Sequence, residues 1–120
     1  MSAADEVPFR SLRAAMSDWV SRHEAEMAGH GTTLELEGSS VGYPKPMVAL
    51  TLENDERIGQ LVLWETGEAE LSVIDVESEQ DLLVESRDVQ SLFGLQEGLD
   101  ALVSAVLGQE KRFAIELPDA

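Results

Sequence analysis

Metal-binding chemistry would have to come from very few nitrogen and sulfur ligands in this chain. The sequence holds two histidines, His23 and His30, and no cysteine, which excludes disulfides, thiolate catalysis and zinc–thiolate sites. His23-Glu24 is similar to the start of the helical metalloprotease motif. That motif needs a second histidine four residues after the first, where this chain has Met27. We therefore interpret His23 as a structural residue rather than a metal ligand.

Oxygen ligands are plentiful, and four of them alternate along one stretch of the chain. These are Asp75, Glu77, Glu79 and Asp81. A calcium-binding EF-hand loop that begins at Asp75 would need glycine at position 80 and glutamate at position 86, where the chain has Gln80 and Ser86. The spacing therefore predicts only weak, nonspecific binding of divalent cations, and we expect no cofactor and no dedicated metal.

The common motifs of catalytic sites are missing from the sequence. The glycines at positions 38, 42 and 67 are isolated turn residues and form no phosphate-binding loop, and there is no Gly-x-Ser-x-Gly motif. Pairs of carboxylates are too numerous to single out a glycosidase pair, which also needs a deeper cleft than 120 residues readily form. The sequence thus indicates a protein that is not an enzyme.

The most unusual feature of the chain is its negative charge. Its 120 residues include 24 Asp and Glu but only 8 Lys and Arg, which gives a formal net charge of −16. Eleven of the acidic residues lie between positions 65 and 100, where Arg87 is the sole base. Because nucleic acids and anionic membranes would be repelled, neither is expected as a partner. The acidic stretch is either a solubilising surface or a surface that binds a basic protein.

Length and composition predict one soluble acidic domain that spans residues 1–120. The chain is 43% hydrophobic, which is enough to build a single core. Its first residues lack the basic and apolar segments of a secretory signal, and no apolar stretch approaches the ~20 residues that cross a bilayer. We therefore expect a cytoplasmic protein, in which residues 1–8 could be a disordered N-terminus.

Hydrophobic spacing divides the chain into two helices and a set of strands. Apolar residues recur every three or four positions over 9–27 and 92–107, which predicts amphipathic helices, the second with Ser91 as its cap and Gly108 as its end. A short strand is expected around Leu34 and Leu36, followed by a loop over 38–46. Four strands with polar turns are predicted at 47–53, 57–65, 68–76 and 81–89, and an edge strand around 113–117. The expected fold is α+β, a two-layer sandwich of an antiparallel meander with an N-terminal and a C-terminal helix packed on one face.

The register of the central hairpin decides which side chains face the helices. With a turn of two or four residues, Trp64 lies opposite Ala69, Val62 opposite Leu71 and Leu63 opposite Glu70. Trp64 and Val62 would then point into the core. The opposite face would combine aliphatic and acidic side chains: Leu61, Leu63, Glu65, Glu68 and Glu70, with Ser72 and Ile74. This face is expected to be open to a partner, unless coiling of the sheet or a loop covers it.

The most distinctive stretch runs from Leu63-Trp64-Glu65-Thr66-Gly67-Glu68-Ala69-Glu70-Leu71 through Val73, Asp75 and Glu77. Together with the leucine-rich helix downstream, this stretch resembles the TriTu family of immunity proteins, which are encoded beside bacterial polymorphic toxins. The resemblance covers the second half of the chain. It implies a cytoplasmic protein that binds and neutralises one cognate toxin domain made by the same cell, and it assigns no individual contact residues.

The charge distribution suggests how such a partner would be bound. Toxins that attack nucleic acids carry basic clefts, and carboxylates could occupy the places of the phosphates while also speeding association. The hypothesis assigns the electrostatic contact to Glu65, Glu68, Glu70, Glu77, Glu79 and Asp81, with Leu61 and Leu63 as apolar anchors. The partner would be a cognate basic toxin domain, and the protein itself a monomer or a weak homodimer.

A second interpretation is a small acidic secretion chaperone, which would hold an effector segment unfolded before its export. Such proteins are also small, acidic, α/β and cytoplasmic. A chaperone of this kind is expected to be dimeric and to bind a disordered peptide. An immunity protein needs no dimer and binds a folded domain, so the oligomeric state and the kind of ligand would separate the two functions.

Overall fold

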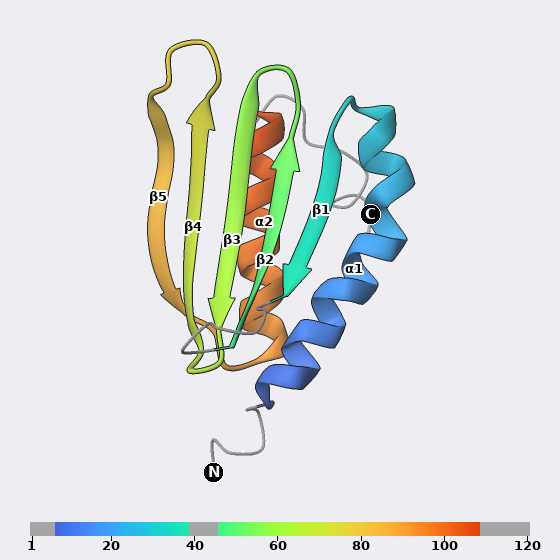
Figure 1. Ribbon diagram of the computed structural model, residues 1–120, viewed down its shortest axis with the longest axis vertical. Helices are drawn as coiled ribbons and strands as arrows, with labels where there is room; N and C mark the ends of the chain where they lie inside the picture. The colour runs from blue at the N-terminus through green and yellow to red at the C-terminus, as the bar shows by residue number, and fades with distance from the viewer. Residues whose placement is uncertain (1–6, 39–45, 109–120) are drawn as a thin grey trace.

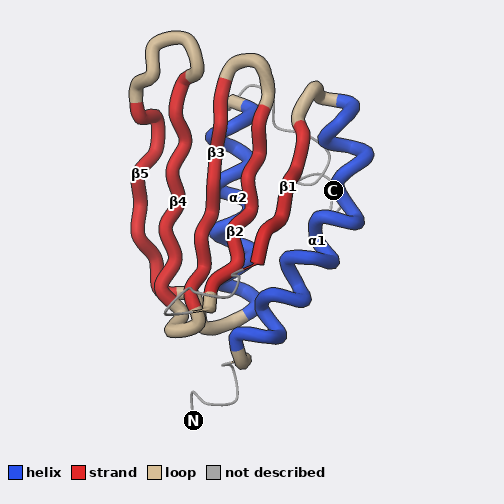
Figure 2. Tube along the Cα trace, viewed as in Figure 1, coloured by secondary structure: helices blue, strands red, loops and turns tan. Residues whose placement is uncertain are grey.

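The computed structural model describes residues 7–38 and 46–108, which form a five-stranded antiparallel sheet and two helices (Figure 1). The elements are α1 (Phe9–Gly29), β1 (Thr33–Gly38), β2 (Met47–Glu53), β3 (Arg57–Trp64), β4 (Glu68–Asp75), β5 (Asp81–Asp88) and α2 (Leu92–Leu107). The strands lie in chain order, β1-β2-β3-β4-β5, so each strand pairs with the next. Both helices lie on the same side of the sheet (Figure 2). The predicted α+β sandwich, with a meander and both helices on one face, is confirmed.

The predicted element boundaries agree closely with the structure. The helix expected at 92–107 and the strand expected at 47–53 have these bounds. The strands expected at 57–65, 68–76 and 81–89 each end one residue earlier than expected. β1 extends the predicted four-stranded meander to five strands within the described residues. The predicted edge strand around 113–117, and residues 1–6 of the segment expected to be disordered, lie outside the described residues.

α1 is an amphipathic helix that packs mainly against β1. Its apolar stripe buries Leu12, Met16, Trp19 and Met27, whereas the charged side chains lie mostly off this stripe. The helix ends at Gly29, and the following Gly31 adopts a φ of +73°, a backbone conformation that favours glycine. Thr32 is then buried, and its backbone N–H donates to the Met27 carbonyl, which fixes the entry into β1.

α2 covers the centre of the sheet because glycines let it come close. The helix begins as predicted at Ser91, whose hydroxyl accepts a hydrogen bond from the Gly94 backbone N–H at 3.0 Å. Gly59 of β3 lies beneath the last turns of the helix, where a Cβ atom would meet the Val106 side chain and lie 3.0 Å from Leu102 Cδ1. Gly59 therefore allows a short distance between helix and sheet that a larger residue would prevent.

The turn between β2 and β3 anchors the C-terminal end of α2. Asn54 Oδ1 accepts the backbone N–H groups of Glu56 and Arg57, both at 2.8 Å, which shapes the turn. From this turn the Arg57 guanidinium donates to the Ala105 carbonyl at 2.8 Å, and Asn54 Nδ2 donates to the Val106 carbonyl at 3.4 Å. These donors satisfy carbonyls that a helix leaves unpaired at its C-terminal end.

The predicted register of the central hairpin is wrong by one residue. The structure pairs Leu63 with Ala69, Val62 with Glu70 and Leu61 with Leu71. The turn between the strands has three residues, 65–67, and Gly67 adopts a φ of +97° and donates to the Trp64 carbonyl. An odd number of turn residues moves the pairing by one position, and a shift of one exchanges the faces of one strand relative to its partner.

This register reverses the expected orientation of the β3 side chains. Leu61 and Leu63, predicted to be exposed anchors, have 0% of their surface exposed and belong to the core beneath α2. Val62 and Trp64, predicted to point into the core, are half-buried on the other face. The core face of the sheet consists of Val48, Leu50, Leu52, Leu61, Leu63, Ala69, Leu71 and Val73.

Candidate functional site

One face of the sheet is left open by the two helices and can be followed row by row across the strands. Among the described residues, one row runs Glu37, Ala49, Val62, Glu70 and Ser86, and the next runs Glu35, Thr51, Gln60, Ser72 and Val84. The outer rows contain Thr33, Glu53, Ile58, Ile74 and Asp81 at one end and Met47, Trp64, Glu68 and Asp88 at the other. We call this set of side chains the open face.

The apolar side chains of the open face are partly accessible, and Gln60 and Ser72 lie between Val62 and the pair Ile58 and Ile74. Ile58 and Ile74 lie opposite each other on β3 and β4 and are half-buried, as are Val62 and Trp64. Val84 of β5 is 72% exposed, which is unusual for a β-branched side chain in a sheet. Exposed apolar side chains bordered by polar ones are the usual composition of a protein-binding surface.

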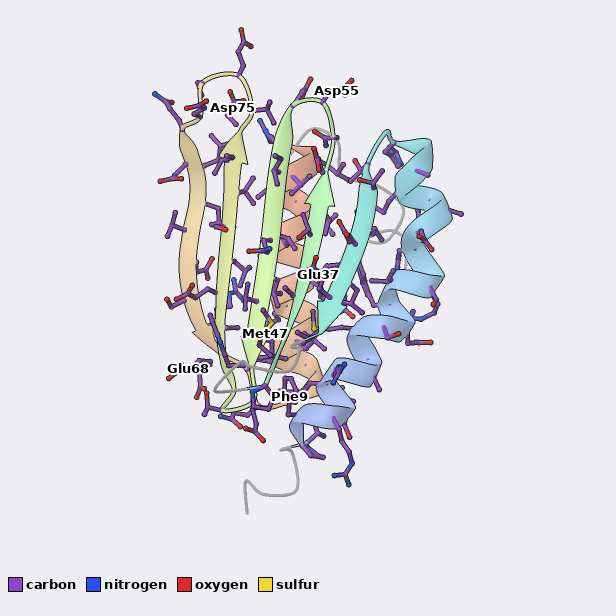
Figure 3. The ribbon with its side chains drawn as sticks, viewed as in Figure 1. Phe9, Glu37, Met47, Asp55, Glu68 and Asp75 are labelled. Atoms are coloured by element: carbon purple, nitrogen blue, oxygen red, sulfur yellow. The ribbon has the colours of Figure 1, made fainter. Side chains whose placement is uncertain are left out.

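Carboxylates border these apolar side chains. Within the described residues the open face carries seven acidic side chains, and all seven are exposed: Glu35, Glu37, Glu53, Glu68, Glu70, Asp81 and Asp88. Figure 3 shows Glu37 on the β1 side of the sheet, and Met47 and Glu68 near the end of the sheet at which α1 begins. The acids therefore lie on both lateral edges and at both ends of the open face.

The arginines of the described residues lie on the other side of the molecule. Arg10, Arg13 and Arg22 belong to α1, and Arg57 points to α2, where it donates to the Ala105 carbonyl. Arg87 stands opposite the buried Ala69 and so points to the helix side, where its Nε donates to Glu85 at 2.8 Å. The open face thus has no arginine or lysine among the residues that the structure describes, and its local field is strongly negative.

The structure divides the predicted contact residues into two groups. Glu68 and Glu70 lie on the open face, and Glu65 is exposed in the adjoining turn. The turn between β4 and β5 holds the exposed Glu77 and Glu79, and Asp81 follows at the start of β5. The two groups are separated by the length of β4, eight residues or roughly 25 Å. They therefore form no single cluster, although both border the same face.

The apolar anchors predicted on β3 need correction. Because Leu61 and Leu63 are completely buried, neither can contact a partner in this fold. Their places on the accessible surface are taken by Val62, Trp64 and Ile58. The sequence interpretation also missed Glu35, Glu37 and Glu53, which lie outside the acidic stretch 65–100; the alternation of Glu35 and Glu37 with Leu34 and Leu36 was a visible signal for the first two.

Asp75 holds the turn between β4 and β5 together (Figure 3). Its carboxylate accepts a hydrogen bond from the Ser78 backbone N–H at 2.8 Å and another from the Ser78 hydroxyl at 2.9 Å. These two bonds, and more weakly the positive charge of Arg57, lower the pKa of Asp75 below its ordinary value of 3.8. The ionised carboxylate therefore orders the turn that presents Glu77 and Glu79.

We expect Asp75 to make folding sensitive to acid. Because its pKa is lowered in the folded state, its stabilising contribution is present above the unfolded-state pKa and is lost as the pH falls through the folded-state value. Replacing Ser78 by alanine keeps the backbone N–H, the larger cause, but removes the hydroxyl, so it should raise the pKa of Asp75 part of the way toward 3.8 and reduce the loss of stability as the pH falls below the unfolded-state pKa. Carboxyl chemical shifts measured against pH give the first result and urea unfolding gives the second. An unchanged Asp75 titration in the variant would contradict this account.

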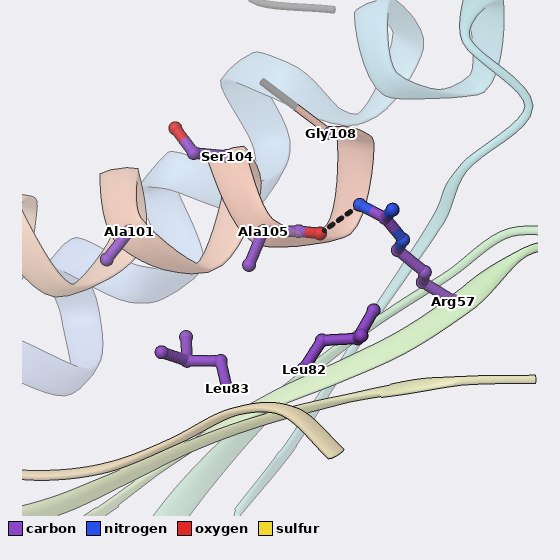
Figure 4. A pocket seen from close by; sticks show the side chains of 7 residues that line it. All are labelled: Arg57, Leu82, Leu83, Ala101, Ser104, Ala105 and Gly108. Carbon is purple, nitrogen blue, oxygen red and sulfur yellow. Dashed lines mark hydrogen bonds between the residues drawn. The ribbon is translucent and has the colours of Figure 1, made fainter. Parts of the chain in front are cut away.

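A groove of about 500 Å³ lies on the helix side, between β5 and the end of α2 (Figure 4). The described residues that line it are mostly apolar, with Ser104 as the hydroxyl and Arg57 as the one charged group. Arg57 Nη1 donates to the Ala105 carbonyl, whereas its Nε is buried without a partner among the described residues. The lining pairs no nucleophile with a base, so its chemistry is that of a helix anchor rather than a catalytic centre.

Residues 7–38 and 46–108 form no group of three or more His, Cys, Asp or Glu side chains that could hold a metal ion. None of their helices combines the length and the apolar character needed to span a bilayer.

Comparison with known proteins adds one family to these observations. The sequence model of the family described as immunity protein TriTu matches residues 12–105. The matched segment runs from the first turn of α1 to the last turns of α2 and includes all five strands that the structure describes. Curated proteins gave no match to this chain.

Proposed function

Because this chain belongs to the TriTu family of immunity proteins, we propose that it binds and neutralises a cognate toxin domain from a bacterial polymorphic toxin system. The observation that supports this most directly is the open face, where seven exposed carboxylates of the described residues border accessible apolar side chains. The partner that fits such a surface is a basic protein domain. The cytoplasm, where the toxin is made, is the compartment in which the two would meet.

The mechanism that we propose is occlusion rather than catalysis. A toxin that cuts or modifies nucleic acid needs a positive cleft for phosphates, and the carboxylates of the open face can occupy the same places. Association steered by opposite charges can reach ~10⁸–10⁹ M⁻¹s⁻¹ at low salt, which suits an inhibitor that must act before damage occurs. After encounter, Val62, Ile58 and Trp64 would supply the desolvated contact that slows dissociation.

The same charge distribution defines partners that we do not expect. Nucleic acid and anionic lipid would both be repelled by the open face. Two copies of the chain would meet with a formal charge of −16 each, so we propose a monomer or at most a weak homodimer. The same negative charge that repels a second copy of the chain attracts a basic partner.

The test is a toxicity assay with the C-terminal domain of the toxin protein encoded beside this gene, which we call the cognate domain. Expression of the cognate domain should stop the growth of a host cell, and co-expression of this chain should restore it. The purified pair should form a complex of folded proteins, with one copy of each by light scattering. Growth arrest that this chain does not relieve would contradict the proposal. A dimer that binds only an unfolded segment of the toxin would instead identify a secretion chaperone.

A further inference from the structure

The outer edge of β5 is exposed along its length. β5 is the last strand in the sheet order, and within residues 7–38 and 46–108 no strand pairs with its outer side. Neither helix covers this edge, since α2 lies behind the middle strands and α1 lies at the opposite side, next to β1 (Figure 1). An edge of eight residues is a surface to which another extended chain can add.

Some of the accessible apolar side chains lie at this edge. The large hydrophobic residues that are exposed in the described part of the chain all lie between positions 76 and 93. They are Val76 (41%), Leu82 (45%), Val84 (72%), Leu92 (52%) and Phe93 (72%). Leu82 and Val84 lie on β5, and Val76 lies in the turn before it. Leu92 and Phe93 belong to the first turn of α2, where Leu92 lies beside Ala15 and Trp19 of α1. The exposed apolar side chains at the edge are therefore those of Val76, Leu82 and Val84.

The hydrogen-bond pattern identifies which backbone groups of β5 point outward. The Val89 N–H donates to the Gly67 carbonyl at 2.7 Å, and in this register the bonded pairs recur at every second residue, including Arg87 with Ala69 and Glu85 with Leu71. The residues between them direct both N–H and C=O away from β4. Val84, Ser86 and Asp88 thus present their backbone groups to the outer edge, and all three are exposed.

The charges along β5 select the kind of chain that could pair with it. Asp81, Glu85 and Asp88 lie on the strand, and its one arginine, Arg87, is already bound by Glu85 at 2.8 Å. On the neighbouring strand Glu68 and Glu70 face the same side as Asp88. Acidic side chains on an edge strand hinder pairing with another acidic chain but attract a basic one.

We propose that β5 binds an extended, basic segment of the cognate toxin domain as a sixth strand of the sheet, an inference that rests on the proposed function. Backbone hydrogen bonds from Val84, Ser86 and Asp88 would hold the added strand, and alternate basic side chains would reach Asp88 and Glu70 on the open face. A second copy of this chain is a poorer occupant, because pairing two β5 edges would bring two sets of acidic residues together.

Amide hydrogen exchange of this protein, free and bound to the cognate domain, tests the inference directly. In the free protein the Val84, Ser86 and Asp88 amides should exchange fast, and those of Leu83, Glu85 and Arg87 slowly. Binding should slow the first set about tenfold or more and leave the second nearly unchanged. A complex in which the outward amides remain unprotected would overturn the inference while leaving the proposed function intact. If the protein fails to bind the cognate domain, both proposals are wrong.

A pair of variants at Ser86 gives an independent measurement. Proline at position 86 removes the outward N–H without removing a bond to β4, and proline is tolerated on edge strands at such positions. Ser86→Pro should weaken binding of the cognate domain by about tenfold, whereas Ser86→Ala, which keeps the N–H, should change it less than about twofold. Circular dichroism spectra of both variants check the fold. Equal affinities of the two folded variants would overturn the inference, as would pairing of β5 with a second copy of this chain.

Discussion

Replacing Leu63 by alanine is expected to lower the free energy of unfolding by about 2–5 kcal/mol, the usual cost of truncating a leucine in a packed core. Leu63 is 0% exposed and pairs with Val48 and Ala69 on the face covered by the helices. Removing its side chain leaves a cavity between helix and sheet that the surrounding residues fill only in part. Urea unfolding monitored by circular dichroism measures the loss.

The matched control is Val62→Ala at the next position of the same strand. Val62 is half-buried on the open face, so its truncation should cost about 1 kcal/mol or less and should instead weaken binding of the cognate domain. Leu63→Ala should therefore lower mainly the stability, and Val62→Ala, at the neighbouring position of β3, should lower mainly the affinity for the cognate domain. If Val62→Ala proves the more destabilising variant, the hairpin has the register that a two- or four-residue turn would give, and the open face has been assigned to the wrong side chains.

The elements of this fold could be predicted from the sequence because their signals are local. The stripes of α1 and α2, the Ser91 cap and the polar turns each involve residues close together in the chain. Register is different, because β3 carries apolar residues on both faces. Ile58, Val62 and Trp64 alternate with Leu61 and Leu63, so the alternation does not show which of the two sets faces the core. The turn length decided the outcome: three residues separate β3 from β4, and the last of them, Gly67, adopts a φ of +97°.

Only part of the candidate site could be predicted, because the rest depends on how distant strands are arranged. An acidic stretch at 65–100 is visible as composition, but its distribution in space depends on how the strands turn. β4 carries Glu68 and Glu70 to one end of the sheet and leaves Glu77 and Glu79 at the other. The open face is completed by acids of β1 and β2, which are far away in sequence. A surface formed by five strands cannot be recognised from one continuous segment.

Reversing two charges on the open face, Glu68→Lys with Glu70→Lys, is expected to slow association with the cognate domain about ten- to a hundredfold at low salt. Both side chains are exposed on β4, on a face that has no basic residue among those that the structure describes. The variant should also show a weaker dependence of the association rate on salt, because less of its rate comes from steering. Stopped-flow mixing over a series of salt concentrations measures both quantities.

The control carries the same change of charge on the helix side, Glu24→Lys with Glu97→Lys. Both side chains are exposed, one on α1 and one on α2, behind the sheet. At 0.1 M salt, where charges are screened beyond a Debye length of about 10 Å, these lysines should alter the association rate only slightly. Equal slowing by the two double variants would mean that overall charge, rather than the open face, governs the encounter. Unaltered rates in the Glu68/Glu70 variant would place the contact on another surface of the protein, and thermal unfolding of all variants excludes a loss of fold as the cause.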